Sequence, residues 1–161
     1  MADLNKLLTP LFLNKNEIKK IIELMFFSYR DFTSGPDKVL AKIKFGRAHH
    51  RVIYFVGKKE NLTIKELLSI LQITKQSLSR VLNQLVEEKY IFLHTGEDKR
   101  TKKLVLSKKG AELEKQLSEI QISKIHNVVK NFNEKEINNF KKVIFEMIDK
   151  KNQKKFHEIN Q

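Results

Sequence analysis

The sequence predicts a mostly α fold with a small β-hairpin wing, in the arrangement of a winged helix-turn-helix. Two features of the middle of the chain predict it. A pair of short amphipathic helices lies between residues 63 and 87, and two apolar strands joined by turn residues follow directly. The third feature is a set of longer amphipathic helices on either side of this unit.

Each of the two motif helices is expected to begin at a threonine. Thr63 and Glu66 have the spacing of a capping box, in which the hydroxyl accepts from a free backbone N–H and the carboxylate reaches back to the cap. The chain should turn at residues 72–73, and Thr74 should open the second helix in the same way. The apolar residues of that helix share one stripe, at spacings of three and four: Leu78, Val81, Leu82, Leu85 and Val86.

The opposite face of the second motif helix carries no acid until Glu87. It presents hydrogen-bond donors, acceptors and one guanidinium, which is the chemistry that a DNA major groove requires. The alternative is an ordinary helical hairpin, whose solvated face would more often mix Glu with Lys. The residues of this helix that we expect to contact DNA are Thr74, Lys75, Gln76, Ser77, Ser79, Arg80 and Gln84.

The predicted wing is a basic β-hairpin. Residues 91–93 and 104–106 are short apolar strands, and Thr95-Gly96-Glu97-Asp98 has the composition of a turn between them. Because basic residues outnumber acids from the turn to residue 110, the hairpin is suited to the minor groove beside the recognition helix. The wing residues that we expect to contact DNA are Lys99, Arg100, Thr101 and Lys102. Ser107 should cap the helix that follows.

The wing and the residues after it resemble the MarR family of bacterial transcription regulators. The match lies in Asp98-Lys99-Arg100 and in LVLSKKG at residues 104–110, which is similar to the family's strand-to-helix ending V-x-L-T-x-x-G. Ser107 stands where the family usually has threonine, and both hydroxyls can cap a helix. The resemblance covers residues 45–110 well and the flanking helices only by length and order. It implies that Asp98 orients an arginine of the wing or of a neighbouring helix.

The composition favours a polyanionic partner and excludes several kinds of chemistry. The 161 residues, enough for one domain, include 32 Lys+Arg against 19 Asp+Glu, a net charge of +13. Without cysteine there is no disulfide, thiolate nucleophile or thiol redox sensor. Dispersed glycines and the absence of a nucleophile motif predict no enzyme and no cofactor. The absence of a leader or long apolar run predicts a cytoplasmic protein without a membrane partner.

The remaining helices organise residues 1–161 into a single domain around a winged unit at 37–110. A first helix, capped by Asn14 or Asn16, is expected to run to about Phe32, and residues 33–36 (TSGP) should break it. A second helix is expected from about 37 to 55. A long helix should run from Gly110 to about residue 131. Asn133 should cap a last helix, whose basic end is expected to fray.

The segments 14–33 and 111–156 are predicted to form a dimerisation region. Amphipathic helices at both ends of a small domain often pair with a symmetry mate, and closure over their own core is the alternative. The family resemblance favours a homodimer. Twofold symmetry then predicts a pseudo-palindromic operator, with recognition helices roughly 34–36 Å apart.

The string FGRAHHR at residues 45–51 is the most unusual part of the expected second helix, and it is similar to PetP-like members of the family. Adjacent histidines point about 100° apart on a helix, so we expect one hydrogen-bonded in the core and one at the surface. A metal site and a pH-sensitive pocket wall are the alternatives, and no metal ligands are assigned. A small-molecule effector should lie between the dimerisation helices and the DNA unit, with these candidate pocket residues: Phe26, Tyr29, Arg47, His50 and Arg51.

These features predict a sequence-specific regulator that binds double-stranded DNA, represses by occluding a promoter and is relieved by a small-molecule effector. One alternative is a ligand-independent, less selective DNA-binding protein. From a different class, the winged helix could be a protein–protein interaction module. The polar, acid-poor face between residues 75 and 84 argues against that module.

Overall fold

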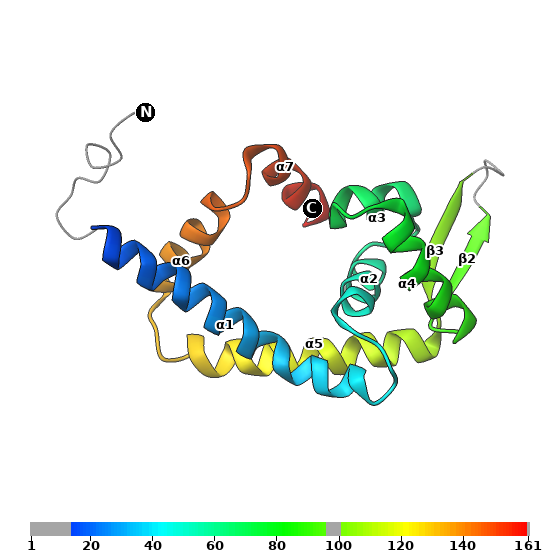
Figure 1. Cartoon of the computed structure of the whole chain (residues 1–161), viewed down its shortest axis with the longest axis horizontal. Helices are drawn as coiled ribbons and strands as arrows, with labels where there is room; N and C mark the ends of the chain where they lie inside the picture. Colours follow the sequence, from blue (N-terminus) through cyan, green and yellow to red (C-terminus); the bar gives the residue numbers. More distant parts are fainter. Residues whose placement is uncertain (1–13, 96–100, 161) are drawn as a thin grey trace.

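The computed structural model describes residues 14–95 and 101–160, and it confirms a mostly α fold with a small antiparallel sheet (Figure 1). No helix in these two ranges is long and apolar enough to cross a membrane. The elements, in chain order, are α1 Lys15–Ala41, α2 Arg47–Lys58, β1 Leu62–Thr63, α3 Ile64–Leu71, α4 Lys75–Glu87, β2 Ile91–Thr95, β3 Lys102–Leu106, α5 Lys108–Val129, α6 Glu134–Glu146 and α7 Lys150–Ile159.

The two motif helices, α3 and α4, begin at the predicted threonines. Thr63 Oγ1 accepts from the Glu66 N–H at 3.2 Å, and the Glu66 carboxylate accepts from the Thr63 N–H at 2.8 Å, so the capping box is complete. Thr74 caps α4 by accepting from the Ser77 N–H at 3.1 Å. Between the helices Gln72 takes a left-handed conformation, with φ 53°, which ends α3 within one residue.

The sheet contains a strand that was not predicted from the sequence. Its order is β1-β3-β2, with both pairings antiparallel, and Leu62 of β1 lies opposite Leu104 of β3. Strand β1 has only two residues, too few for an alternating pattern to be visible in the sequence. Because Leu62 and Leu104 are both fully buried, this short pairing fastens the start of α3 to the wing.

The hydrophobic core joins the helix-turn-helix to the start of α5. Helices α2, α3 and α4 turn their apolar faces toward each other and toward the sheet. Leu117 of α5 is fully buried, which places the first half of that helix within the core of the winged unit. The fully buried leucines and isoleucines are Leu40, Ile53, Leu62, Leu67, Leu78, Leu85, Ile91, Leu104 and Leu117.

Helix α1 runs without interruption through residues 33–36, so the predicted helix break at this position is wrong. A proline inside a helix removes one backbone hydrogen bond and crowds the preceding turn. The carbonyl that would accept from residue 36 is that of Phe32. The neighbouring carbonyl of Asp31 accepts from the hydroxyl of Ser34 at 2.9 Å and from Lys124 of α5. Pro36 itself is fully buried, so packing of the surrounding chain holds the helix through it.

The crossing of α1 and α5 explains the glycine beside this proline. A Cβ added to Gly35 would lie 2.6 Å from Cγ2 of Ile120. The glycine therefore lets α5 approach α1 closely, as Figure 1 shows for the two long helices lying side by side. The Gly-Pro pair is a packing feature of one long helix rather than a turn.

The true break after α1 lies at residues 42–46, inside the helix that was predicted from 37 to 55. Lys44 takes a left-handed conformation there with φ 58°, which is uncommon for a lysine. Helix α2 then begins at Arg47, after the extended residue Gly46. A left-handed lysine has no signature in composition, so this turn could not be predicted from local residue types.

The C-terminal end forms two helices rather than one followed by a frayed tail, which corrects the prediction for this region. Asn133 caps α6 as expected, accepting from the Glu136 N–H at 3.0 Å. Helix α7 then turns back toward the winged unit (Figure 1). There the side-chain oxygen of Asn152 accepts from the Gln72 side-chain amide at 3.1 Å, at the turn between α3 and α4.

The capping box makes a prediction about pH. A hydrogen bond from Lys59 at 2.8 Å and those from Thr63 lower the pKa of Glu66 from 4.5 to about 2, although burial opposes the shift. A depressed pKa gives stability that is complete above the ordinary value and is lost as pH falls toward the folded value. Glu66→Gln should therefore be less stable than the parent at about pH 7. The difference between the urea unfolding curves should shrink as pH falls below about 4.5 and vanish only as pH falls to about 2. A stability difference that stayed constant with pH would contradict this assignment.

Candidate nucleic-acid interface

Helix α4 exposes the polar face that was predicted for it. Its opposite face is anchored in the core by Leu78, Leu82 and Leu85, with exposed fractions of 1%, 5% and 0%. Anchoring at three positions fixes the rotation of the helix about its axis. The following predicted contact residues are consequently exposed together: Thr74, Lys75, Gln76, Ser77, Ser79 and Arg80.

The charges of this face are available to a ligand. Within residues 14–95 and 101–160, neither Lys75 nor Arg80 forms an ion pair with an acidic side chain. Thr74 donates its hydroxyl proton to the Ser77 oxygen at 2.8 Å, which leaves the Ser77 proton for an acceptor outside the chain. The face therefore offers two cations and several donors at the start of a helix, where the backbone dipole also favours anions.

Gln84 is placed differently from the other predicted contacts. It is half-buried, and its side-chain oxygen lies 2.8 Å from Nε2 of His49 on α2. Its amide nitrogen donates to Glu88 at 3.2 Å. Both polar atoms of Gln84 are therefore engaged within the protein, which argues against a contact with a DNA groove.

The C-terminal end of α4 is held by residues that were not assigned to the site from the sequence. Lys109 lies with its ammonium 3.9 Å from the centre of the Tyr90 ring and donates to the carbonyl of Glu88 at 3.0 Å. The hydroxyl of Ser107 donates to the carbonyl of Lys89 at 2.7 Å and accepts from the Gly110 N–H at 2.9 Å. The start of α5 thus holds the C-terminal end of α4 in place. Ser107 is confirmed as the N-cap of α5.

The wing is described up to its tip. Strands β2 and β3 pair from Ile91 with Leu106 to Thr95 with Lys102, and Lys102 is exposed while Thr101 is half-buried. Three predicted wing residues, Asp98, Lys99 and Arg100, lie outside the described residues. The paired strands carry the chain away from the core beside α4 (Figure 1).

The candidate effector residues do not form one enclosed site in the protomer. Arg47 bonds Asp37 through two nitrogens at 2.9 and 2.8 Å, and its guanidinium lies 5.5 Å from the centre of the Tyr29 ring. Burial lowers the pKa of His50. The other candidates project into solvent: the exposed fraction is 72% for Phe26, and Arg51 is also exposed.

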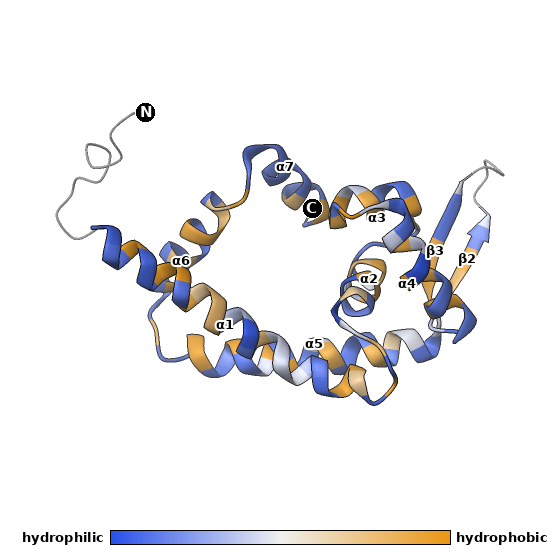
Figure 2. Ribbon diagram, viewed as in Figure 1, coloured by the Kyte–Doolittle hydropathy of each residue, from blue (hydrophilic) through white to orange (hydrophobic). Residues whose placement is uncertain are grey.

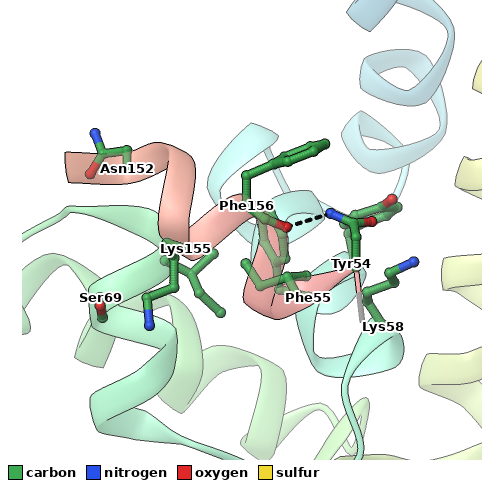
Figure 3. Close-up of a pocket in the computed structure, with 10 residues that line it drawn as sticks. Tyr54, Phe55, Lys58, Ser69, Asn152, Lys155 and Phe156 are labelled. Atoms are coloured by element: carbon green, nitrogen blue, oxygen red, sulfur yellow. Dashed lines mark hydrogen bonds between the residues drawn. The ribbon is translucent and has the colours of Figure 1, made fainter. Parts of the chain in front are cut away.

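Two cavities in the described part of the chain have other linings. One of about 280 Å³ lies between α2, α3 and α7, where Figure 3 shows Phe156 and Lys155 of α7 with Tyr54 and Ser69 of the winged unit. A second, of about 440 Å³, lies between α2 and α5. Neither is lined by a candidate effector residue, and no group of three His, Asp or Glu side chains in the described ranges could hold a metal.

A helix-turn-helix followed by a three-stranded sheet with a projecting hairpin defines the winged-helix class. Residues 44–101 match the sequence model of the MarR family. The HTH-type transcriptional regulator PetP of Rhodobacter capsulatus is 41% identical over 142 residues, a stretch that covers 88% of this chain and 86% of PetP. The chain therefore belongs to the MarR family, and it is a transcriptional regulator rather than an enzyme.

Solved structures show the same fold at much lower identity. A mutant of MarR from E. coli, complexed with operator DNA, is 20% identical with a TM-score of 0.65, covering 88% of this chain and 100% of that one. The MepR–DNA complex of S. aureus is also 20% identical, with a TM-score of 0.64, and covers 78% and 93%. At this identity the likeness concerns the fold alone.

Proposed function

We propose that the protein is a homodimeric, single-domain repressor that binds a specific sequence of double-stranded DNA. The observation that carries the proposal is the exposed face of α4, which presents Lys75, Gln76 and Arg80 with no acid before Glu87. The DNA bound in the MarR and MepR complexes supports it, since both proteins share this fold. Chromosomal DNA would place the protein in the cytoplasm.

The proposed readout follows from the chemistry of the side chains. Arg80 has the fork of donors that pairs with O6 and N7 of guanine, and Gln76 has the donor and acceptor that pair with adenine. Both lie in the first turns of α4, where recognition helices meet base edges. Lys75 and the hydroxyl residues Thr74, Ser77 and Ser79 fix the helix on the phosphates.

The wing would add contacts in the adjacent minor groove. We assign phosphate contacts to Lys99 and Lys102, with Thr101 beside them, and insertion into a narrow A·T groove to Arg100. A guanidinium loses its hydration more readily than an ammonium, which suits it to that position. Asp98 would orient an arginine, because an acid beside phosphate is unfavourable unless it is paired.

The dimer is supported by apolar surface that the protomer leaves uncovered. None of the residues of α6 is buried, although the helix carries apolar segments (orange in Figure 2). In α1 the buried residues are limited to its last third. The exposed apolar residues of α1, α5, α6 and the C-cap of α6 are Ile21, Ile22, Leu24, Met25, Phe26, Phe27, Tyr29, Ile122, Ile125, Val128, Phe140, Val143, Ile144 and Met147.

This apolar surface is more than a solvated monomer normally shows, and a twofold partner would cover it. Such a dimer would bind a pseudo-palindromic operator and occlude the promoter that contains it. Relief by a small-molecule effector between the dimer helices and the winged unit completes the proposal. Tyr29 supplies an aromatic wall for such a ligand, and the Arg47 guanidinium, 5.5 Å from that ring, supplies a cation that is paired with Asp37 in the protomer.

Substitution of Arg80 tests the proposed function. Arg80→Ala should weaken binding to a selected operator by about 1–3 kcal/mol per half-site, because each α4 helix of the dimer loses one bidentate base contact. Binding to random duplex DNA should change much less. Fluorescence anisotropy with the duplex that the parent selects from a random pool, and with the unselected pool, measures both.

A matched control separates this effect from a simple loss of charge. Lys115→Ala also removes one cation, from a side chain that is 76% exposed and belongs to α5 rather than to α4 or the wing. It should leave operator affinity unchanged. Equal losses on operator and random DNA for Arg80→Ala would demote Arg80 to a phosphate contact and favour the less selective DNA-binding protein.

A further inference from the structure

His49 joins the start of α2 to the recognition helix through three contacts. Its Nδ1 accepts from the Gly46 N–H at 3.1 Å, and its Nε2 lies 2.8 Å from Oε1 of Gln84 on α4. Its ring stacks on Phe45, with centroids 4.5 Å apart and planes within 1°. Phe45 in turn packs against Tyr90, at the end of α4, with ring centroids 5.0 Å apart.

These contacts favour one tautomer of the neutral imidazole. The Gly46 N–H is a donor only, so Nδ1 must carry a lone pair. Gln84 presents its oxygen to Nε2, so Nε2 must carry the proton and donate it. The neutral Nε2–H tautomer is the form that makes both bonds at once.

The Gly46 bond also supplies a cap that α2 otherwise lacks. Glycine at the N-cap has no side chain to accept from the first turn, and His49 occupies the third helical position, where capping boxes usually place Glu or Gln. The same ring therefore orders the start of α2 and extends across to α4. The Gly46 bond fixes the ring on its Nδ1 side, and the Nε2 side faces Gln84.

Gln84 stands in line with the proposed base-contacting residues. It follows Gln76 and Arg80 at steps of four on α4, so the three lie along nearly the same side of the helix. Its amide nitrogen donates to Glu88 one turn later, at 3.2 Å, so both polar atoms of the side chain are restrained. Restraining Gln84 from α2 therefore restrains the direction in which Arg80 projects.

We propose that His49 is a positioning residue for DNA readout: through Gln84 it adds a polar restraint, beside the three buried leucines, that refines the rotation of α4 about its axis. This inference rests on the proposed function. Misalignment of a recognition helix weakens base contacts, which need a fixed geometry, more than phosphate contacts, which tolerate movement. His49 would thus determine selectivity without touching DNA.

The test uses the full chain and a double-mutant cycle. His49→Asn keeps an acceptor near the position of Nδ1 for the Gly46 N–H but has no atom at the position of Nε2, so it cannot reach Gln84. Gln84→Met keeps the shape of the side chain without its polar atoms. Each single variant should lower affinity for the selected operator roughly three- to tenfold, while affinity for random duplex DNA stays the same.

The double variant should lose no more operator affinity than either single one, since both remove the same link. Thermal unfolding should be changed little by Gln84→Met. Losses that add in the double variant, or that are equal on operator and random DNA, would overturn the positioning role. Failure of the parent to prefer any duplex would instead overturn the proposed function.

A measurement without DNA tests the geometry separately. Long-range proton–nitrogen NMR of the imidazoles should show His49 in the parent as the neutral Nε2–H tautomer. In Gln84→Met the signal of that Nε2 proton should shift because the acceptor has gone. An Nδ1–H tautomer in the parent, or no shift in the variant, would contradict the inference whatever the DNA results.

Discussion

Phe140→Asp should convert the protein from dimer to monomer and weaken operator binding on the order of 100-fold or more. Phe140 is 61% exposed in the protomer and lies on one side of α6 with Val143, which is 60% exposed; Met147, at the C-cap of this helix, is 52% exposed. A carboxylate placed there costs the protomer little but would be buried unpaired in the proposed interface. Two recognition helices that are no longer linked lose the gain from binding two half-sites together. Sedimentation and operator titration measure the two effects.

Asn138→Asp is the matched control for this variant. It adds the same charge to α6, at an exposed position on the opposite side of the helix from Phe140. It should remain a dimer with the affinity of the parent. If Phe140→Asp remained a dimer while the control behaved normally, α6 would not form the interface.

Gly110→Ala should lower the free energy of unfolding by about 3 kcal/mol, at the upper end of the usual effect of overpacking. The added Cβ would lie 2.1 Å from the backbone oxygen of Tyr90, where no flexible side chain can move aside. The Ser107 N–H donates to that same oxygen at 2.9 Å. The added Cβ would therefore also disturb the hydrogen bond that joins the residue before β2 to the N-cap of α5. Urea unfolding of the purified protein measures the loss.

Gly46→Ala provides the comparison. A Cβ at Gly46 meets no atom within 4 Å, and this residue is also at a helix start. Its cost should stay below about 1 kcal/mol, the usual range for an N-cap glycine. If the two variants were equally stable, the close contact at Gly110 would not be the reason for its glycine.

The parts of the fold that were predicted correctly are those specified by local chemistry. Thr63, Thr74, Ser107 and Asn133 all cap helices in the structure, because a cap depends on a side chain and the backbone within three residues of it. The predictions that were wrong depend on contacts between residues far apart in the sequence. Helix α1 continues through Pro36 because residues of α5, more than 80 positions later in the chain, pack against that region.

The candidate site also has one part that follows from local sequence pattern and another that depends on contacts with distant residues. The polar face of α4 could be predicted because the helical period separates it from the buried stripe. Gln84 belongs to that face by period, yet it bonds to His49, which is 35 positions earlier. The supports at Tyr90 and Lys109 likewise depend on the meeting of α4 with α5. Periodicity shows which way a side chain points and not which element it will meet.

The spacing of protected bases on DNA tests the central claim most directly, that two α4 helices read one operator as a twofold pair. Hydroxyl-radical footprinting of the selected duplex should show two inverted half-sites, with centres about one helical turn, or 10–10.5 base pairs, apart. Arg80→Ala should remove both protected segments together at the concentration that saturates the parent. Protection of a single half-site, or uniform weak protection along the duplex, would contradict the account.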